Sequence, residues 1–258
     1  MSRRRLSVLI ALVMGLTGCA GKPADSVTLE VDLPAQFRFI AGANYSPATG
    51  ETCTLPTRRG RRPERKILIT QYKPEAEIVS FDLPLAQVIE GCPTVLRSVD
   101  FDVRAKWGAR DSDVGGDRAV VGIRDRWEYG TGMPESGVQA LPGRCHWLFR
   151  TVGPQHAIAK ILQCRSLDAT GRQRLAGGVA QRDQLAGKKL RMVLALTDEE
   201  EPYFDDNWVA VPGGWKRCKG KSFEDTFAYC GSNTTDFKPI KMPDGRICDV
   251  YPTCRNKE

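Results

Sequence analysis

Nine cysteines in a chain of 258 residues constrain this fold more than any other feature of the sequence. Nine is an odd number, so at least one cysteine has a role other than disulfide pairing. A count this high is unusual for a reducing compartment and typical of a compartment where disulfides form. The sequence therefore predicts a disulfide-stapled protein of an oxidising compartment, with one cysteine set apart.

Cys19 is the cysteine set apart. Residues 3–5 are arginines, and residues 6–16 form an apolar stretch that is too short to span a bilayer and is typical of a signal peptide. The stretch ends in Leu-Thr-Gly-Cys, which resembles a bacterial lipobox. The resemblance implies that residues 1–18 are removed, that Cys19 is acylated, and that residues 19–26 form a lipidated tether. The alternative is an ordinary secretory peptide cut before a disulfide cysteine.

The residue after Cys19 indicates which membrane holds the anchor. Ala20 stands there rather than an aspartate. By resemblance to enterobacterial sorting signals, this favours the outer membrane. We therefore expect a bacterial lipoprotein on the periplasmic face of that membrane.

The net charge gives no support for a nucleic-acid partner. The formal charge is +7, but three of the 38 basic residues lie in the signal peptide, which leaves 35 basic against 31 acidic residues, or +4. Nucleic-acid binding requires a concentrated basic stripe, and a charge of this size does not indicate one.

The remaining eight cysteines predict four disulfides. Pairing of sequence neighbours is the simplest pattern, and the last four cysteines are equally free to exchange partners within the C-terminal tail. A zinc site is the alternative, but the sequence has no C-x-x-C motif and only two histidines. The candidates, in the order of neighbour pairing, are Cys53, Cys92, Cys145, Cys164, Cys218, Cys230, Cys248 and Cys254.

Alternating and β-branched segments separated by turns predict a mainly β fold. The pattern is clearest in residues 96–107, where Val99, Phe101 and Val103 occupy one face and charged residues the other. Weak helical patterns occur only at 85–90 and 172–185. We expect an antiparallel β-sandwich arranged as two small disulfide-stapled β domains.

Residues 131–143, which are rich in glycine and proline, predict where the two domains meet. A linker there divides the chain into a β domain at 27–130 and a disulfide-rich β domain at 144–258. The alternative is that 131–143 is a long loop inside a single domain.

Known catalytic and metal motifs are missing from the sequence. It has no G-x-S-x-G, H-E-x-x-H, P-loop or G-x-G-x-x-G motif, and the histidines His146 and His156 do not support a nucleophilic triad. Residues 111–117 resemble the start of a calcium loop, but Gly122 stands where the bidentate glutamate belongs, so a polar turn is expected. We expect a protein that is not an enzyme and holds no cofactor or metal.

Two charged segments are the candidate binding surfaces. A basic segment is a candidate to face a membrane or another anion, and its candidates are Arg58, Arg59, Arg61 and Arg62. An acidic segment with two embedded aromatics is suited to a cationic cleft of a protein partner, and its candidates are Asp198, Glu199, Glu200, Glu201, Tyr203, Phe204, Asp205 and Asp206. Solvated loops are the alternative for both.

The lipobox, the segment Phe37–Cys53 (FRFIAGANYSPATGETC) and the terminal cysteine cluster together resemble a family of lipoproteins. These are immunity proteins that protect Gram-negative bacteria from type VI secretion phospholipase effectors, particularly the phospholipase D type. The resemblance implies a one-to-one complex with a secreted lipase whose active-site entrance is occluded, with the acidic segment as a phosphate mimic. The alternative is an envelope lipoprotein that binds cell wall, lipopolysaccharide or an assembly partner.

Overall fold

The computed structural model describes residues 25–55, 65–126, 128, 132–222, 225, 227–231 and 233–254. Within these ranges no helix is both long and apolar enough to cross a membrane. The signal peptide, Cys19 and most of the expected tether lie outside the described residues. So do the four arginines of the basic segment, Arg58, Arg59, Arg61 and Arg62.

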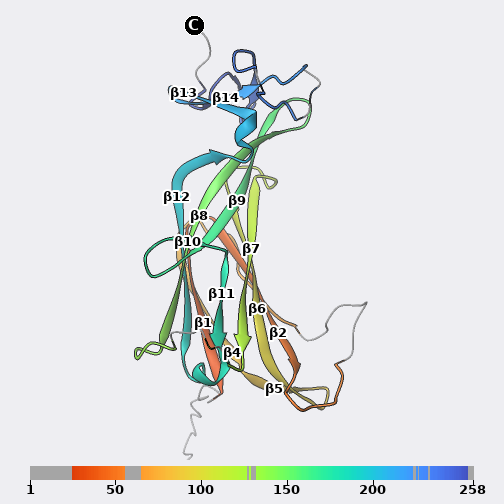
Figure 1. The fold of residues 1–258 in the computed structure, drawn as a ribbon, viewed down its shortest axis with the longest axis vertical. Coiled ribbons are helices and arrows are strands. Elements are labelled where there is room, and N and C mark those ends of the chain that lie inside the picture. The colour runs from red at the N-terminus through yellow and green to blue at the C-terminus, as the bar shows by residue number, and fades with distance from the viewer. Residues whose placement is uncertain are drawn as a thin grey trace, which may run out of the picture.

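The expected mainly β fold is confirmed, and the molecule is elongated (Figure 1). The first twelve strands are β1 (Ser26–Leu33), β2 (Phe37–Pro47), β3 (Arg65–Ile69), β4 (Glu77–Pro84), β5 (Ala86–Ile89), β6 (Cys92–Lys106), β7 (Val114–Arg124), β8 (Val138–Val152), β9 (Ala157–Leu167), β10 (Gln173–Arg174), β11 (Gly177–Gln181) and β12 (Lys189–Pro202). The later strands are β13 (Trp208–Val211), β14 (Gly214–Cys218), β15 (Phe237–Lys238), β16 (Ile240–Lys241), β17 (Ile247–Cys248) and β18 (Tyr251–Pro252). Two short 3-10 turns are η1 (Arg182–Gln184) and η2 (Asp205–Asn207).

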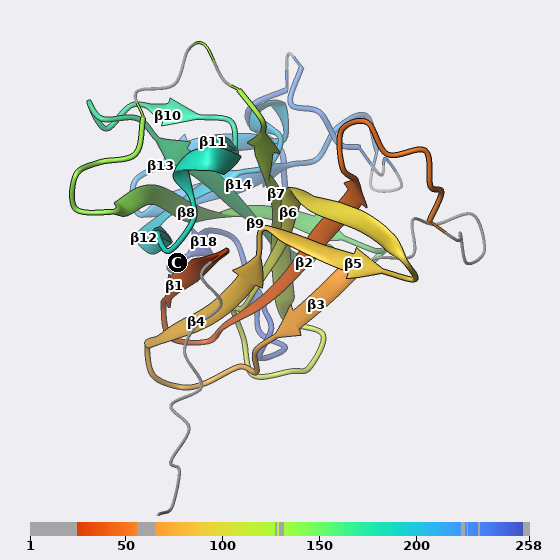
Figure 2. The same cartoon turned by 90° about the horizontal axis from the view of Figure 1, so that it is seen from below.

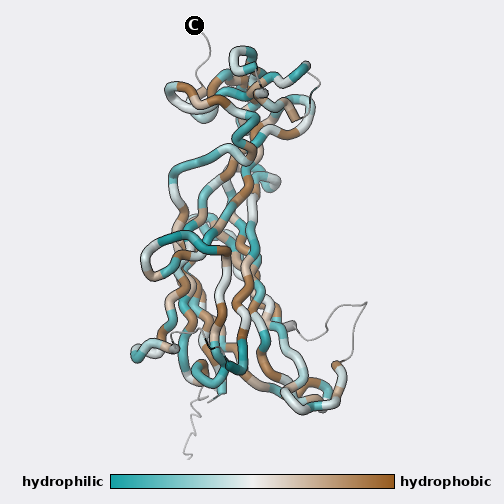
Figure 3. The backbone as a smooth tube through the Cα atoms, in the orientation of Figure 1, coloured by the Kyte–Doolittle hydropathy of each residue, from teal (hydrophilic) through white to brown (hydrophobic). Residues whose placement is uncertain are grey.

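Two large sheets face each other and form the body of the protein (Figure 2). One sheet has the order β17-β16-β9-β8-β12-β1-β4, and the other has the order β11-β7-β6-β2-β3. The side chains between them form the main hydrophobic core, which includes Val31, Phe39, Phe101 and Leu190. Strand alternation produces this core: Val99, Phe101 and Val103 of β6 point inward, as expected, and the tube coloured by hydropathy alternates along the body strands (Figure 3).

The sheets are mixed, which corrects the expectation of a purely antiparallel sandwich. β12 runs parallel to β1 on one side and to β8 on the other, with Thr28 opposite Lys189 and Val138 opposite the same lysine. β11 is likewise parallel to β7. The cause is the chain path, because β12 enters the sheet between two strands that precede it in sequence, and short hairpins do not constrain its direction.

The weak helical patterns are wrong. Residues 85–90 include β5, which forms a hairpin with β6 in which Ile89 pairs with Cys92. The hairpin turn is Glu90-Gly91, and both residues have positive φ (48° and 79°), the conformation that a two-residue turn requires. Residues 172–185 form β10, β11 and the single turn η1.

Strands from both sides of residues 131–143 share one sheet. β8 begins at Val138, inside that range, and β12 connects β8 to β1. The main core likewise takes Val27 from the N-terminal part and Leu190 from the C-terminal part.

A smaller unit at one end of the molecule, which we call the head, consists of the described residues 203–254. Its own sheet has the order β13-β14-β15, with β18 also paired to β14, whereas β16 and β17 of the head extend the first body sheet beyond β9. Phe149 of β8 and Ile158 of β9 reach into the head and pack there with Trp208, Ile240 and Tyr251. The ends of β8 and β9 thus connect head and body.

Four disulfides staple the chain, and each joins neighbouring cysteines in sequence. Cys53 is bonded to Cys92 and Cys145 to Cys164 in the body, whereas Cys218 is bonded to Cys230 and Cys248 to Cys254 in the head. Cys145 and Cys164 are directly opposite each other on β8 and β9. The head has few buried apolar side chains, so its two disulfides are central to its stability.

Candidate functional site

The acidic segment lies where the body meets the head. β12 continues through residues 198–202, so this part of the segment is strand rather than loop, and η2 holds Asp205 and Asp206. The backbone N–H of Tyr203 donates to the carbonyl of Phe149 at 2.8 Å, which fixes the start of the head against β8. Both aspartates of η2 are exposed.

Glu200 points inward, unlike its neighbours. Its side chain is 21% exposed, and its carboxylate accepts hydrogen bonds from Lys160 and from the hydroxyl of Tyr251. The Lys160 ammonium also lies 5.8 Å from the ring centres of both Trp107 and Tyr251. Lys160, Glu200 and Tyr251 form a polar cluster, which we call the neck, so the Glu200 carboxylate is paired within the fold and only partly exposed.

The other acidic candidates are exposed. Asp198 and Glu199 extend from β12, and the Glu201 carboxylate lies 3.9 Å from Nε2 of His146. The exposed carboxylates therefore lie on both sides of the neck, along β12 and on η2.

Two pairs of aromatic rings are exposed on the head. Tyr203 and Phe204 pack edge to face with ring centres 4.5 Å apart, and Phe227 and Tyr229 stack with ring centres 6.0 Å apart. Their exposures range from 41% to 66%, which is high for aromatic side chains. Phe227 and Tyr229 could not be assigned from the sequence, because the residues around them show no alternation that would distinguish a buried position from an exposed one.

A groove of about 800 Å³ lies between these features. Residues of the turn after β8 line it, together with residues of η2 and the start of β13, Asp225 and Phe227. Its chemically distinctive lining residues are Arg150, His156, Phe204, Asn207, Arg217 and Phe227. Its size lies within the range of ordinary ligand sites.

Arg217 holds the groove together. The side chain is 4% exposed, and its guanidinium donates to the carbonyls of Asn207 (3.0 Å), Ala228 (2.7 Å) and Phe227 (2.9 Å) and to the hydroxyl of Thr151 (3.0 Å). Burial lowers the pKa of Arg217 to about 10, so the side chain still carries its charge at neutral pH. A buried cation thus joins β14, η2 and the carbonyls of Phe227 and Ala228.

The positive charges also affect His156, which sits in the turn between β8 and β9. Partial burial, followed by the charges of Lys238 and Arg217, lowers the pKa of His156. Asp225 faces the same groove, and hydrogen bonds from the backbone N–H groups of Ala228 and Lys221 hold the pKa of its carboxyl below the usual value. The groove therefore has more positive than negative charge on its lining.

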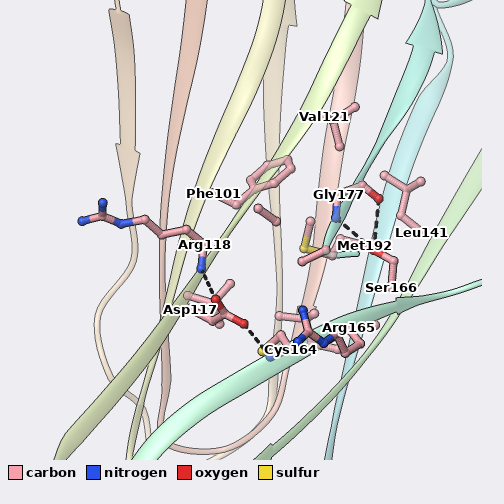
Figure 4. A pocket seen from close by; sticks show the side chains of 15 residues that line it. Phe101, Asp117, Arg118, Val121, Leu141, Cys164, Arg165, Ser166, Gly177 and Met192 are labelled. Carbon is pink, nitrogen blue, oxygen red and sulfur yellow. Dashed lines mark hydrogen bonds between the residues drawn. The ribbon is translucent and has the colours of Figure 1, made fainter. Parts of the chain in front are cut away.

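A second cavity, inside the body, is not suited to a ligand. It lies between the sheets, where Phe101, Val121, Leu141 and Met192 line it (Figure 4), and its volume of about 30 Å³ is close to that of one water molecule. Asp117 at its edge accepts a hydrogen bond from the backbone N–H of Cys164 at 2.7 Å.

The region that resembled a calcium loop connects β6 to β7. Asp113, 1% exposed there, accepts hydrogen bonds from the backbone N–H of Arg110 (3.0 Å) and from its Nε (2.9 Å). Among the described residues, no three metal-ligating side chains come together.

No protein-family model matches this chain, and neither a curated protein nor a solved structure is significantly similar to it.

Proposed function

We propose that the chain is a lipid-anchored binding protein of the bacterial envelope that presents its head to a protein partner. We further propose that the partner is a secreted antibacterial phospholipase, which the head inhibits by covering the entrance of its active site. The observation that carries the first part is the position of the head relative to the N-terminal end of the fold.

That position follows from strand direction. β1 and β12 are parallel, so Ser26 lies beside the start of β12, whereas the head follows the end of β12 (Figure 1). β12 has 14 residues. At about 3.3 Å per residue it spans about 45 Å. A membrane anchor attached before Ser26 would hold the head about that far from the lipid.

The chemistry of the head supports a protein partner. Exposed aromatic pairs supply the large rigid contact area that interface hot spots require, and the exposed Asp205 and Asp206 directly follow one of these pairs in the chain. A phospholipase binds lipid phosphate with cationic groups, and Asp205 and Asp206 are placed to meet such groups beside Tyr203 and Phe204. The acidic segment thus suits a phosphate mimic, through η2 rather than through Glu200.

The test uses a secreted phospholipase whose gene lies beside this one; a locus without such a gene would count against a phospholipase as the partner. Directed to the periplasm, that enzyme should kill cells that lack the protein and spare cells that make it, and the two proteins should co-purify one to one. The variant Phe204→Ala should lose both properties, whereas Leu175→Ala, at an exposed apolar side chain of the body, should lose neither. Killing that continues despite wild-type protein, together with no complex, would refute inhibition.

The anchor is tested separately. A fatty-acid probe that labels lipoproteins should label the wild-type chain and not Cys19→Ser. If deletion of the gene weakens the envelope in the absence of any toxin, a structural envelope lipoprotein becomes the better interpretation.

A further inference from the structure

The lining of the groove and its rim, formed by the exposed aspartates of η2, carry opposite charge. Asp205 and Asp206 stand outside on η2, whereas Arg150 and Arg217 line the inside together with His156. The one carboxylate among the described lining residues is that of Asp225. Three backbone N–H groups already donate to it, those of Lys221, Phe227 and Ala228.

Both groove arginines lack a carboxylate partner in the described part of the chain. The Arg150 side chain is exposed, and its guanidinium lies 5.8 Å from the ring centre of Tyr203. The Arg217 guanidinium is bonded to carbonyl and hydroxyl oxygens rather than to a carboxylate, and the negative charge of Asp225 compensates its charge in part. Charges on a partly desolvated surface favour an anion that offers two oxygens to a guanidinium.

Asn207 adds a second requirement. It lines the same groove and is 7% exposed, and its side-chain oxygen has no hydrogen-bond partner among the described residues. A buried acceptor without a donor costs free energy until a ligand supplies one. The occupant must therefore carry an anion and a hydrogen-bond donor, and apolar atoms for the rings of Phe204 and Phe227.

We infer that the groove binds an acidic peptide segment of the protein partner, with an Asp or Glu carboxylate at Arg150 and a main-chain N–H at Asn207. An extended peptide brings both groups on one chain, and its neighbouring side chains cover the two aromatic pairs. This inference rests on the proposed function, because it takes the partner to be a protein. It adds that the contact is two-sided: the rim meets basic groups of the partner and the groove meets acidic ones.

The test uses no phospholipase, so its outcome is independent of the proposed inhibition. A phage library of random linear peptides is selected on the full-length chain in detergent and counter-selected on the variant Arg150→Gln. The enriched sequences should share an Asp or Glu flanked by apolar residues. No enrichment, or enrichment without an acidic position, would overturn the inference.

Synthetic peptides then locate the contact. An enriched peptide should bind at least about tenfold more tightly than its isostere, the same peptide with Asn or Gln in place of its Asp or Glu. The variant Arg150→Gln should remove that difference. Asn207→Leu should weaken binding of both peptides, whereas Arg124→Gln, at an exposed arginine of β7 in the body, should change neither affinity. Equal affinity for the acidic peptide and its isostere would refute the carboxylate contact.

Competition with inorganic phosphate tests the alternative that the groove is a site for phosphate groups. Phosphate should not displace the peptide at concentrations near physiological ones. Full displacement by phosphate at such concentrations, with the same dependence on Arg150, would show a site for phosphate groups and overturn the assignment to a peptide.

Discussion

The hydroxyl of Tyr251 donates a hydrogen bond to the carboxylate of Glu200, and this contact joins β18, the last strand of the head, to β12 of the body. Tyr251 is buried, and its ring packs 4.6 Å from that of Phe149. Lys160 binds the same carboxylate from β9. Three strands that are distant in sequence therefore meet at one carboxylate.

Tyr251→Phe should lower the free energy of unfolding by about 1–2 kcal/mol, because it removes this hydrogen bond and leaves the ring in place. Glu200→Gln should cost more, because it also removes the charge that pairs with Lys160. Urea unfolding followed by fluorescence measures both. A Tyr251→Phe protein as stable as the wild type would show that the hydroxyl contributes nothing at the neck.

Stability should also fall at high pH, and Tyr251 should cause part of the fall. Burial, followed by the hydrogen bond to Glu200 and its charge, raises the pKa of Tyr251, and burial raises the pKa of Tyr45 to about 12. These tyrosines stay protonated in the native state while unfolded tyrosines ionise near pH 10, so their contribution is complete below about pH 10 and is lost as the pH rises above it. Unfolding midpoints should decline less steeply with pH in Tyr251→Phe and Tyr45→Phe than in the wild type.

Gly115 of β7 lies so close to its neighbours on β8 and β9 that the fold should not accommodate a side chain there. A Cβ there would lie 2.5 Å from Cζ3 of Trp147 and 2.8 Å from the backbone nitrogen of Leu162. Gly115→Ala should therefore destabilise the body by about 1–3 kcal/mol. Gly122→Ala on the same strand is the matched control, because its Cβ would meet nothing closer than 4.0 Å. Equal thermal midpoints for the two variants would contradict the packing described.

Arg217→Met should loosen the head and leave the body folded. The change leaves the carbonyls of Asn207, Phe227 and Ala228 without their donor, at a cost of about 3 kcal/mol or more. Hydrogen exchange should rise in residues 225–229 and not in β6. Lys216→Met, at the preceding residue of β14, is the control and should change exchange little, because the Lys216 ammonium lies over the Phe237 ring and forms no hydrogen bond or ion pair among the described residues.

Part of this architecture was predictable from strand periodicity. The alternation of Val99, Phe101 and Val103 predicts that one face of a sheet is buried, and that face packs in the core. The parallel placement of β12 was not predictable, because the match of Thr28 with Lys189 depends on contacts between segments that share no local signal.

The sequence predicts which residue types form the site, but not how they are arranged in space. Within a run of acidic residues Glu200 cannot be distinguished by charge, and only the alternation of β12 places it on the face opposite Glu199 and Glu201. That signal was hidden, because the apolar pattern that predicts a strand at 189–196 ends before the acidic run. The groove depends on Arg217 and Phe227, which meet only in the folded head.

Acid should act through the turn at Asp168. A hydrogen bond from the Thr170 hydroxyl, followed by backbone N–H donors from Arg172 and Thr170 and by Arg174, lowers the pKa of Asp168 to about 2. A lowered pKa stabilises the fold above about pH 4, where the unfolded carboxyl is ionised, and the contribution is lost as the pH falls toward 2. Asp168→Asn should therefore be less stable than the wild type at neutral pH and should lose less stability in acid. If the stability of the two proteins falls equally with pH in acid, Asp168 does not contribute to the loss of stability.

Charge reversal on η2 should slow association with the phospholipase partner. Asp205→Lys/Asp206→Lys replaces two exposed carboxylates beside Tyr203 and Phe204 with cations, which would repel a cationic cleft. Because rim charges act mainly on encounter, the association rate constant should fall about tenfold at low salt, and added salt should reduce the difference between variant and wild type. Glu51→Lys/Glu75→Lys, at exposed carboxylates of the body, makes the same change in net charge away from the head and should slow association far less. Equal slowing by the two double variants in stopped-flow measurements would mean that net charge, rather than the surface formed by η2, steers the partner.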